Sequence, residues 1–105
     1  VGLNDRYADG TDISWIWDTD FEKLADLGDK LQGVIVTGIR SAEIAMRFKY
    51  AGISTDKITV ITNYEKMLET VANQDSPTFI MPTYTAMLEI REILSRVYSY
   101  KEFWK

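Results

Sequence analysis

Gly33-Val34-Ile35-Val36-Thr37-Gly38 is the stretch that decides the fold. Four consecutive β-branched residues between two glycines are typical of a strand that is buried on both faces. The residues that follow predict a helix, with Ser41 as its N-cap and Gly52 just beyond its end. A buried strand that leads directly into a helix predicts a parallel sheet covered by helices.

The order of a strand followed by a helix recurs twice further along the chain. Residues 58–62 are predicted as a second buried strand, and Asn63 caps the helix after it. Residues 78–81 are predicted as a third buried strand that leads into a last helix. The predicted inward-facing helix residues are Ile44, Ala45, Phe48 and Ala51, then Tyr64, Met67, Leu68 and Val71, then Met87, Leu88, Ile90, Leu94 and Val97. This pattern predicts an α/β fold class, namely a Rossmann-like three-layer domain with a mostly parallel sheet.

The length and composition suit one globular domain, residues 1–105. Of these residues 46% are hydrophobic, and a chain of this size usually forms a single core. Residues 1–3 read as the end of a strand. Because a domain seldom begins inside a strand, we expect the chain to be cut from something longer. No apolar run approaches the roughly 18–20 residues of a membrane-spanning helix.

The segment before the first buried strand is predicted to be a turn region followed by a helix. Residues 4–12 have the Asn, Asp and Gly content of turns. Thr19 and Glu22 have the spacing of a capping box, which places a helix start there. The apolar residues 13–17 before this start are therefore predicted to be extended, and the helix is predicted to end at Gly28.

The missing residue types and the uneven charge exclude several functions. The chain contains no histidine and no cysteine. By itself it cannot form a Ser-His-Asp or Cys-His nucleophile system or an ordinary structural zinc site. The net charge is −4, and residues 1–29 carry eight Asp and Glu against Arg6 and Lys23. This acidic N-terminal part of the chain argues against a general nucleic-acid-binding face.

The turn after the first buried strand is a candidate phosphate or nucleotide site. Ligands bind open parallel sheets at the carboxyl ends of the strands, where Thr37, Gly38 and Arg40 lie. A glycine turn, a helix N-terminus and an arginine are the parts that an anion site requires. The alternative is an ordinary turn with Arg40 at the surface. The sequence contains neither the GxGxxG dinucleotide motif nor a P-loop.

Residues 4–22 carry six carboxylates and are called the acidic segment below. The segment has three interpretations, and the residues alone leave them open. Asp5, Asp9 and Asp12 could bind Mg²⁺, since hard cations prefer carboxylate ligands. They are equally suited to turns and helix caps. In the third interpretation, one of them orients a histidine of a partner protein and stabilises its charged form. Asp18 and Asp20 have capping roles available, whereas Asp12 has no obvious local role and is freer to reach outward.

Several motifs resemble one family. They are Asn4-Asp5, Ala8-Asp9-Gly10-Thr11-Asp12-Ile13-Ser14-Trp15-Ile16-Trp17-Asp18, Asp20-Phe21-Glu22, Thr37-Gly38-Ile39-Arg40, Arg47, Lys49-Tyr50-Ala51-Gly52 and Pro82-Thr83-Tyr84-Thr85-Ala86-Met87-Leu88-Glu89. Together they resemble the C-terminal domain of MurT, the Mur-ligase-like subunit of lipid II isoglutaminyl synthase. The resemblance spans almost the whole chain, and its tryptophan-rich run is too long for chance agreement.

The resemblance implies a role in peptidoglycan biosynthesis. In this family the MurT subunit uses ATP to activate the α-carboxyl of D-glutamate in the lipid II stem peptide. Ammonia comes from GatD, a glutamine amidotransferase that hydrolyses glutamine with a cysteine and a histidine. The resemblance implies that the MurT C-terminal domain lends an aspartate to that pair in trans. We expect this catalytic residue to be Asp12, then Asp18, then Asp9.

The resemblance also implies what surrounds the domain. ATP and Mg²⁺ act in the full-length enzyme, whose P-loop and zinc site belong to a central domain, so no cofactor is expected for this chain alone. The family places a strand and a helix before residue 1, and Arg40 is expected to approach the nucleotide when the domains close. The implied partners are GatD and lipid II, and the implied location is the cytoplasm, at the inner face of the membrane. The isolated chain is expected to be inactive.

Two other functions stay open at this point. The chain could be a docking module for GatD that contributes no catalytic atom. It could also be a stand-alone receiver-like α/β domain that binds Mg²⁺ at the acidic segment. A receiver requires a lysine after a late strand, and the third predicted strand ends in Met81-Pro82-Thr83 instead.

Overall fold

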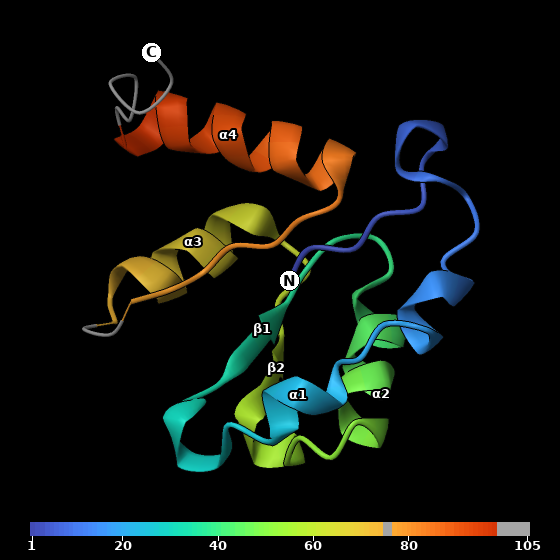
Figure 1. Cartoon of the computed structure of the whole chain (residues 1–105). Coiled ribbons are helices and arrows are strands. Elements are labelled where there is room, and N and C mark those ends of the chain that lie inside the picture. The colour runs from blue at the N-terminus through green and yellow to red at the C-terminus, as the bar shows by residue number, and fades with distance from the viewer. Residues whose placement is uncertain (75–76, 99–105) are drawn as a thin grey trace.

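The computed structural model describes residues 1–74 and 77–98. At its centre is a parallel sheet in which Val34 of β1 lies opposite Ile58 of β2 (Figure 1). The strands are β1 (Val34–Val36) and β2 (Ile58–Val60), and the α-helices are α1 (Glu22–Ala25), α2 (Ser41–Tyr50), α3 (Tyr64–Ala72) and α4 (Tyr84–Tyr98). The 3₁₀-helices of the described residues are η1 (Tyr7–Asp9), η2 (Ser14–Trp17), η3 (Gly28–Lys30) and η4 (Thr55–Lys57). The prediction of helices alternating with parallel strands is confirmed for β1 and β2.

A short segment at the start of the chain extends the sheet on the side of β1 that is opposite β2. The N–H of Leu3 donates to the carbonyl of Thr37 at 3.0 Å. The N–H of Gly2 donates to the carbonyl of Met81 at 3.1 Å. Residues 1–3 therefore run parallel to β1, between it and the segment that carries Met81, as the end of a strand would.

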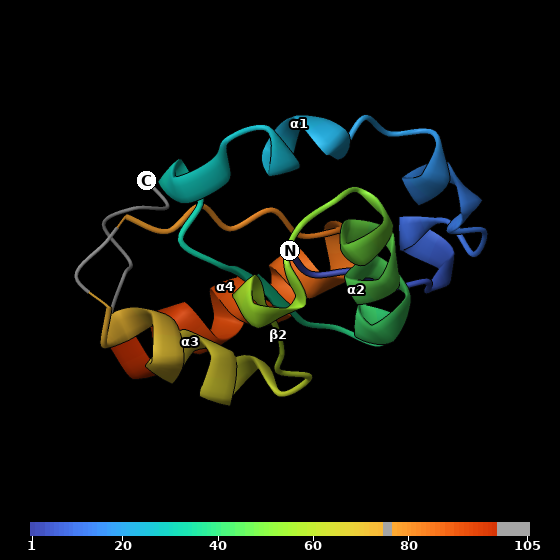
Figure 2. The same cartoon turned by 90° about the horizontal axis from the view of Figure 1, so that it is seen from below.

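Two apolar cores hold the helices against the strands. Val34 and Val36 belong to the first core, whereas Ile35 packs against the second, because alternate residues of a strand face opposite sides. The first core consists of Leu3, Ile16, Val34, Val36, Ile44, Phe48 and Ile53, and the second of Met67, Leu68, Ile90 and Ile93. The second core joins α3 to α4, which lie side by side and apart from α1 in both views (Figures 1 and 2).

The prediction of burial is wrong for two of the three strands. Thr59 and Val60 of β2 are exposed, because within the described residues β2 pairs only with β1 and forms the edge of the sheet. Residues 78–81 are assigned to no strand, and the side chain of Phe79 is 84% exposed. A hollow of about 1100 Å³ lies between this segment and the start of β1, so only its end at Met81 bonds to the sheet.

The acidic segment also differs from the prediction. Residues 13–17 are not extended, because the N–H of Ile16 donates to the carbonyl three residues earlier at 3.1 Å and η2 forms. The capping box is wrong as well. The hydroxyl of Thr19 donates to a carbonyl of η2 at 3.1 Å, and the carboxylate of Glu22 binds an arginine of α2. Without this cap the helix is only the short α1, which ends at Ala25.

The middle helices follow the prediction closely. α2 and α3 turn their predicted apolar faces toward the cores, and Asn63 caps α3 by accepting the N–H of Lys66 at 3.0 Å. The cap of α2 differs: Arg40 is the N-cap, and Ser41 is a buried first residue whose side chain forms no cap. The sequence Asp75-Ser76-Pro77 also predicts a turn, and residues 98–105 form an aromatic, basic tail in the sequence. Residues 75–76 and 99–105 lie outside the described part of the chain.

The last helix is rotated relative to the predicted inner face. α4 packs on α3 through Ile90 and Ile93, so Leu88 and Val97 are exposed rather than buried. None of the helices in the described residues is long and apolar enough to cross a membrane.

Candidate functional site

Arg47 of α2 fixes the acidic segment to the body of the domain. Its side chain is only 4% exposed. Nε donates to the carbonyl of Ile16 at 2.7 Å, and Nη2 donates to the carbonyl of Thr19 at 2.8 Å. Nη1 and Nη2 also donate to the two carboxylate oxygens of Glu22, at 3.0 and 2.8 Å. One buried cation therefore joins η2, the turn after it and the start of α1 to α2.

Aromatic rings surround this cation. The guanidinium carbon of Arg47 lies 5.5 Å from the ring centroid of Trp17 and 5.4 Å from that of Phe21, within the range of a cation–π interaction. Trp17 packs edge-on against Tyr50 with centroids 5.8 Å apart, and Phe21 packs against Phe48 at 5.0 Å. The acidic segment is thus fixed by ring packing as well as by hydrogen bonds.

The ion pair favours the charged form of both partners. The hydrogen bond from Arg47 lowers the pKa of Glu22, and the same bond raises the pKa of Arg47. This role of Arg47 was not predicted from the residue pattern. A signal was available, because Arg47 is adjacent to Phe48 and one turn after Ile44, on the predicted inner face of its helix. A buried cation must find acceptors.

Asp12, the first candidate for a catalytic aspartate, lies just before η2. Its Oδ1 accepts the N–H of Ser14 at 2.8 Å, so the expectation that Asp12 has no local role is wrong. The side chain is exposed, and the hydrogen bond from Ser14 lowers the pKa of Asp12. Asp12 is therefore an ionised surface carboxylate with one oxygen already bound to the backbone.

Asp18, the second candidate, follows the last residue of η2. Its side chain is exposed and, in the described part of the chain, forms no hydrogen bond or ion pair. The start of α1 has no side-chain cap, so the capping roles expected for Asp18 and Asp20 are wrong. Asp12 and Asp18 therefore lie at the two ends of η2, the 3₁₀-helix that Arg47 binds.

Asp9, the third candidate, is bound to the start of α4. Its Oδ1 accepts the N–H of Thr85 at 2.7 Å, and its Oδ2 accepts the hydroxyl of Thr85 at 2.5 Å and the N–H of Arg6 at 3.2 Å. Partial burial raises the pKa of Asp9, but the hydrogen bonds from Thr85 outweigh this and keep the pKa below its ordinary value. Asp9 is consequently the least available of the three aspartates.

A buried asparagine connects the same region to the sheet. The amide of Asn4 donates to the hydroxyl of Thr85 at 2.9 Å and to that of Tyr64 at 3.1 Å. Its Oδ1 accepts the N–H of Ile39 at 2.8 Å. Asn4 therefore links the starts of α3 and α4 to the turn after β1, at the carboxyl edge of the sheet.

Replacing Asp9 with asparagine is expected to make stability less sensitive to acid. The folded-state pKa of Asp9 is depressed, so its stabilisation is present above the unfolded carboxyl pKa of about 4 and is lost as the pH falls through the folded value. Urea unfolding from about pH 6 to about pH 2 should show a shallower loss of stability for Asp9→Asn than for the wild type. Asp26→Asn, at an exposed position after α1, is the control. Equal slopes for Asp9→Asn and the wild type would contradict the prediction.

The predicted nucleotide turn is occupied by contacts within the protein. Thr37 and Gly38 are buried, and the N–H of Arg40 donates to a backbone carbonyl at 2.9 Å. The guanidinium of Arg40 binds Asp5 at 2.8 Å, and its Nε lies 3.0 Å from Glu43 without hydrogen-bond geometry. Thr37, Gly38 and Arg40 do share one turn, in which Nη1 of Arg40 already binds Asp5. Nucleotide binding at this turn stays a prediction.

The carboxylates proposed for Mg²⁺ are each bound elsewhere. The partners of Asp5, Asp9 and Asp12 are Arg40, Thr85 and Ser14, respectively. Over residues 1–74 and 77–98, no three Asp or Glu side chains are grouped in a way that could bind a metal ion. The structure therefore gives no support to the magnesium interpretation of the acidic segment.

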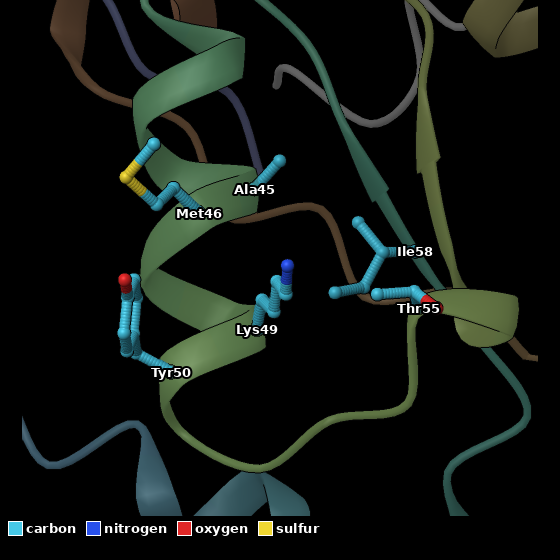
Figure 3. A pocket seen from close by; sticks show the side chains of 6 residues that line it. All are labelled: Ala45, Met46, Lys49, Tyr50, Thr55 and Ile58. Carbon is cyan, nitrogen blue, oxygen red and sulfur yellow. The ribbon is translucent and has the colours of Figure 1, made fainter.

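An aromatic face, made by Met46, Tyr50 and Trp17, lies on the outer side of α2 beside η2. Tyr50 is 71% exposed and Trp17 is 50% exposed, and their rings are in contact. A shallow groove of about 300 Å³ begins there, and Figure 3 shows the side chain of Lys49 extending into it toward Ile58. Exposed aromatic rings and methionine are enriched where proteins bind one another. The aromatic face is therefore a candidate interaction surface next to the exposed aspartates.

Comparison with known proteins gives relatives over nearly the whole chain. A family model described as MurT ligase C-terminal matches residues 1–87. The lipid II isoglutaminyl synthase (glutamine-hydrolyzing) subunit MurT of Streptococcus pneumoniae is 47% identical over 96 residues, which are 90% of this chain and 21% of that protein. The subunit of the same name from Staphylococcus aureus strain COL is 36% identical over 96 residues, or 91% of this chain and 21% of that protein.

The chain thus spans about a fifth of the length of these relatives. The matches cover the acidic segment, η2 and the turn after β1, which carry the candidate residues. The chain belongs to the MurT ligase C-terminal family.

Proposed function

We propose that this chain is the C-terminal domain of a MurT-type subunit, that it docks a GatD-type glutamine amidotransferase, and that it supplies this partner with an aspartate. The full enzyme amidates the α-carboxyl of D-glutamate in the lipid II stem peptide, with ATP and glutamine, at the inner face of the cell membrane. The relatives are named as subunits of a glutamine-hydrolyzing lipid II isoglutaminyl synthase. A chain without histidine or cysteine can join a catalytic triad only in trans.

The observation that carries the proposal is the pair of exposed carboxylates at the two ends of η2. An aspartate that serves a catalytic histidine must be ionised and held in one orientation. Asp12 fulfils both conditions through the N–H of Ser14. Asp18 is exposed but has no such bond in the described residues, and Asp9 is committed to Thr85. These contacts support the order Asp12, Asp18, Asp9.

The docking part of the proposal is tested with the aromatic face. Tyr50→Ala in the full-length subunit is expected to weaken association with the amidotransferase subunit about tenfold or more, because buried aromatic residues dominate interface energies. Phe79→Ala is the matched control, because Phe79 is 84% exposed on a segment away from that face. Association is measured by titration calorimetry. If Tyr50→Ala binds the partner as tightly as Phe79→Ala and the wild type do, the docking surface lies elsewhere.

A docking module that contributes no catalytic atom is the second candidate function. The aromatic face favours it, because exposed rings bind a partner without any carboxylate taking part. The two functions differ in one measurable property. In a pure docking module, Asp12→Asn and Asp18→Asn leave the glutaminase activity of the assembled complex unchanged.

Two finer features belong to the same proposal. The sheet is taken to be that of a Rossmann-like three-layer domain of the Mur ligase C-terminal type, which the two cores on opposite sides of β1 support. Thr37, Gly38 and Arg40 are proposed to approach ATP, held with Mg²⁺ by the rest of the enzyme. In this structure Nη1 of Arg40 binds Asp5.

A further inference from the structure

We propose that Arg47 is a positioning residue, which sets the orientation in which η2 presents Asp12 and Asp18 to the partner. This inference rests on the proposed function, since it concerns how the aspartate is delivered. Arg47 is buried, so it acts on the carboxylates through the backbone of η2 and not by contact with the partner.

Arg47 fixes the chain on both sides of Asp18. It binds the carbonyl of Ile16, inside η2, at 2.7 Å and the carbonyl of Thr19, just after η2, at 2.8 Å. The ring of Trp17 lies against the same guanidinium. Asp18 therefore extends from a backbone that is anchored both before and after it.

Arg47 also acts on Asp12, through the other end of η2. Ser14 is the first residue of η2, and its N–H is bound by Asp12 at 2.8 Å. The carbonyl that Arg47 binds belongs to the same short helix. A shift of η2 would consequently move Asp12 as well as Asp18, whichever of the two serves the partner.

Only an arginine side chain has the geometry for these contacts. Its Nε, Nη1 and Nη2 lie in one plane and donate here to three separate groups, on Ile16, Thr19 and Glu22. A lysine has a single nitrogen on a flexible stem and cannot bind all three in this arrangement. Arg47→Lys therefore keeps the charge but loosens η2.

The burial of this cation is costly as a means of stability alone. Arg47 is 4% exposed whereas Glu22 is 52% exposed, so the loss of hydration on burial falls on the arginine, and a well-packed apolar residue often stabilises a protein as much as a buried charge does. A buried arginine that binds two backbone carbonyls has a different advantage: it specifies one orientation of the segment. That orientation is what an aspartate delivered to another chain requires.

The test uses Arg47→Lys in the full-length subunit, assembled with its amidotransferase subunit. Glutaminase kcat per assembled complex is expected to fall about tenfold or more, while KM for glutamine changes less than about twofold, because glutamine binds the partner. A merely structural role would lower the amount of complex and leave kcat per complex unchanged. Wild-type kcat in the assembled Arg47→Lys complex overturns the inference.

A second variant keeps the test decisive if Arg47→Lys does not fold. Arg47→Met has a similar length and removes the buried charge together with its desolvation cost. Its assembled complex is also expected to lose kcat, and a wild-type kcat would overturn the inference. Asp12→Asn and Asp18→Asn, assayed alongside, distinguish a failure of the proposed function from a failure of the positioning role of Arg47. If both keep full activity, the proposed function fails. If either loses activity while both Arg47 variants keep it, only the positioning role fails.

Discussion

The substitution Gly38→Ala is expected to lower the free energy of unfolding by about 3 kcal/mol or more. Gly38 has a φ of +95°, which side-chain-bearing residues rarely adopt. A Cβ at this position would lie 2.6 Å from the carbonyl oxygen of Leu3 and 2.7 Å from Oδ1 of Asn4. Neither atom is free to move, because Leu3 bonds to the sheet and Asn4 binds the turn after β1. The added Cβ would therefore clash with Leu3 and Asn4, which connect other segments at the carboxyl edge of the sheet.

Gly10→Ala is a matched control for the backbone strain. Gly10 has a similar φ of +87°, but no described atom lies within 4 Å of a Cβ built there. This variant is expected to lose less, about 2 kcal/mol, which is the cost of the backbone conformation alone. Urea unfolding of both variants measures the difference. Equal losses would show that the contacts of Gly38 with Leu3 and Asn4 do not restrict the position.

Arg47→Ala is expected to lower the free energy of unfolding by about 3 kcal/mol. The variant removes the donor to the carbonyls of Ile16 and Thr19, and the bond to Ile16 is buried, where an unpaired acceptor is costly. It also releases the carboxylate of Glu22 and removes the packing of the guanidinium against Trp17. Denaturant unfolding followed by tryptophan fluorescence measures the loss.

Arg96→Ala is the control that shows how much of the loss in Arg47→Ala comes from burial and how much from the loss of a charge paired with glutamate. Arg96 also pairs with a glutamate, Glu65, at 3.1 Å, but the two side chains are 57% and 58% exposed. Exposed pairs contribute about 1 kcal/mol or less. If Arg96→Ala lowers the free energy of unfolding as much as Arg47→Ala does, the buried contacts of Arg47 add no more stability than an exposed ion pair.

The parts of the fold that the sequence predicted correctly are those with a local cause. The strand β1 lies in a β-branched run between two glycines, and the apolar faces of α2 and α3 repeat at helical spacing. Asn63 caps α3 through a residue three positions on, which is visible in the sequence. The failures have distant causes. Residues 14–17 form η2, which Arg47 binds, and the contact of Arg47 with Ile16 spans 31 positions of the chain.

The same distinction applies to the strands and the candidate site. An apolar run at residues 78–81 predicts a strand, but its burial depends on the chain beside it, which local pattern does not show. The exposure of Asp12 agrees with the expectation from the turn composition of residues 4–12, whereas Asp18 was expected to cap a helix and is exposed without doing so. The commitment of Asp9 to Thr85, 76 positions away, and the bond between Asp12 and Ser14 were not predicted. Local composition identifies the carboxylates, but it did not show the local bond of Asp12 with Ser14 or the tertiary contact that makes Asp9 unavailable.

The most direct test of the account is the glutaminase activity of the full two-subunit complex with Asp12→Asn, beside Asp18→Asn. Complex formation is measured in the same samples. Asparagine keeps the shape of the side chain but cannot stabilise a charged imidazole. The account predicts that Asp12→Asn assembles normally and loses glutaminase kcat by about 100-fold or more. Normal assembly with wild-type activity in both variants would contradict it and leave docking alone as the function of this face.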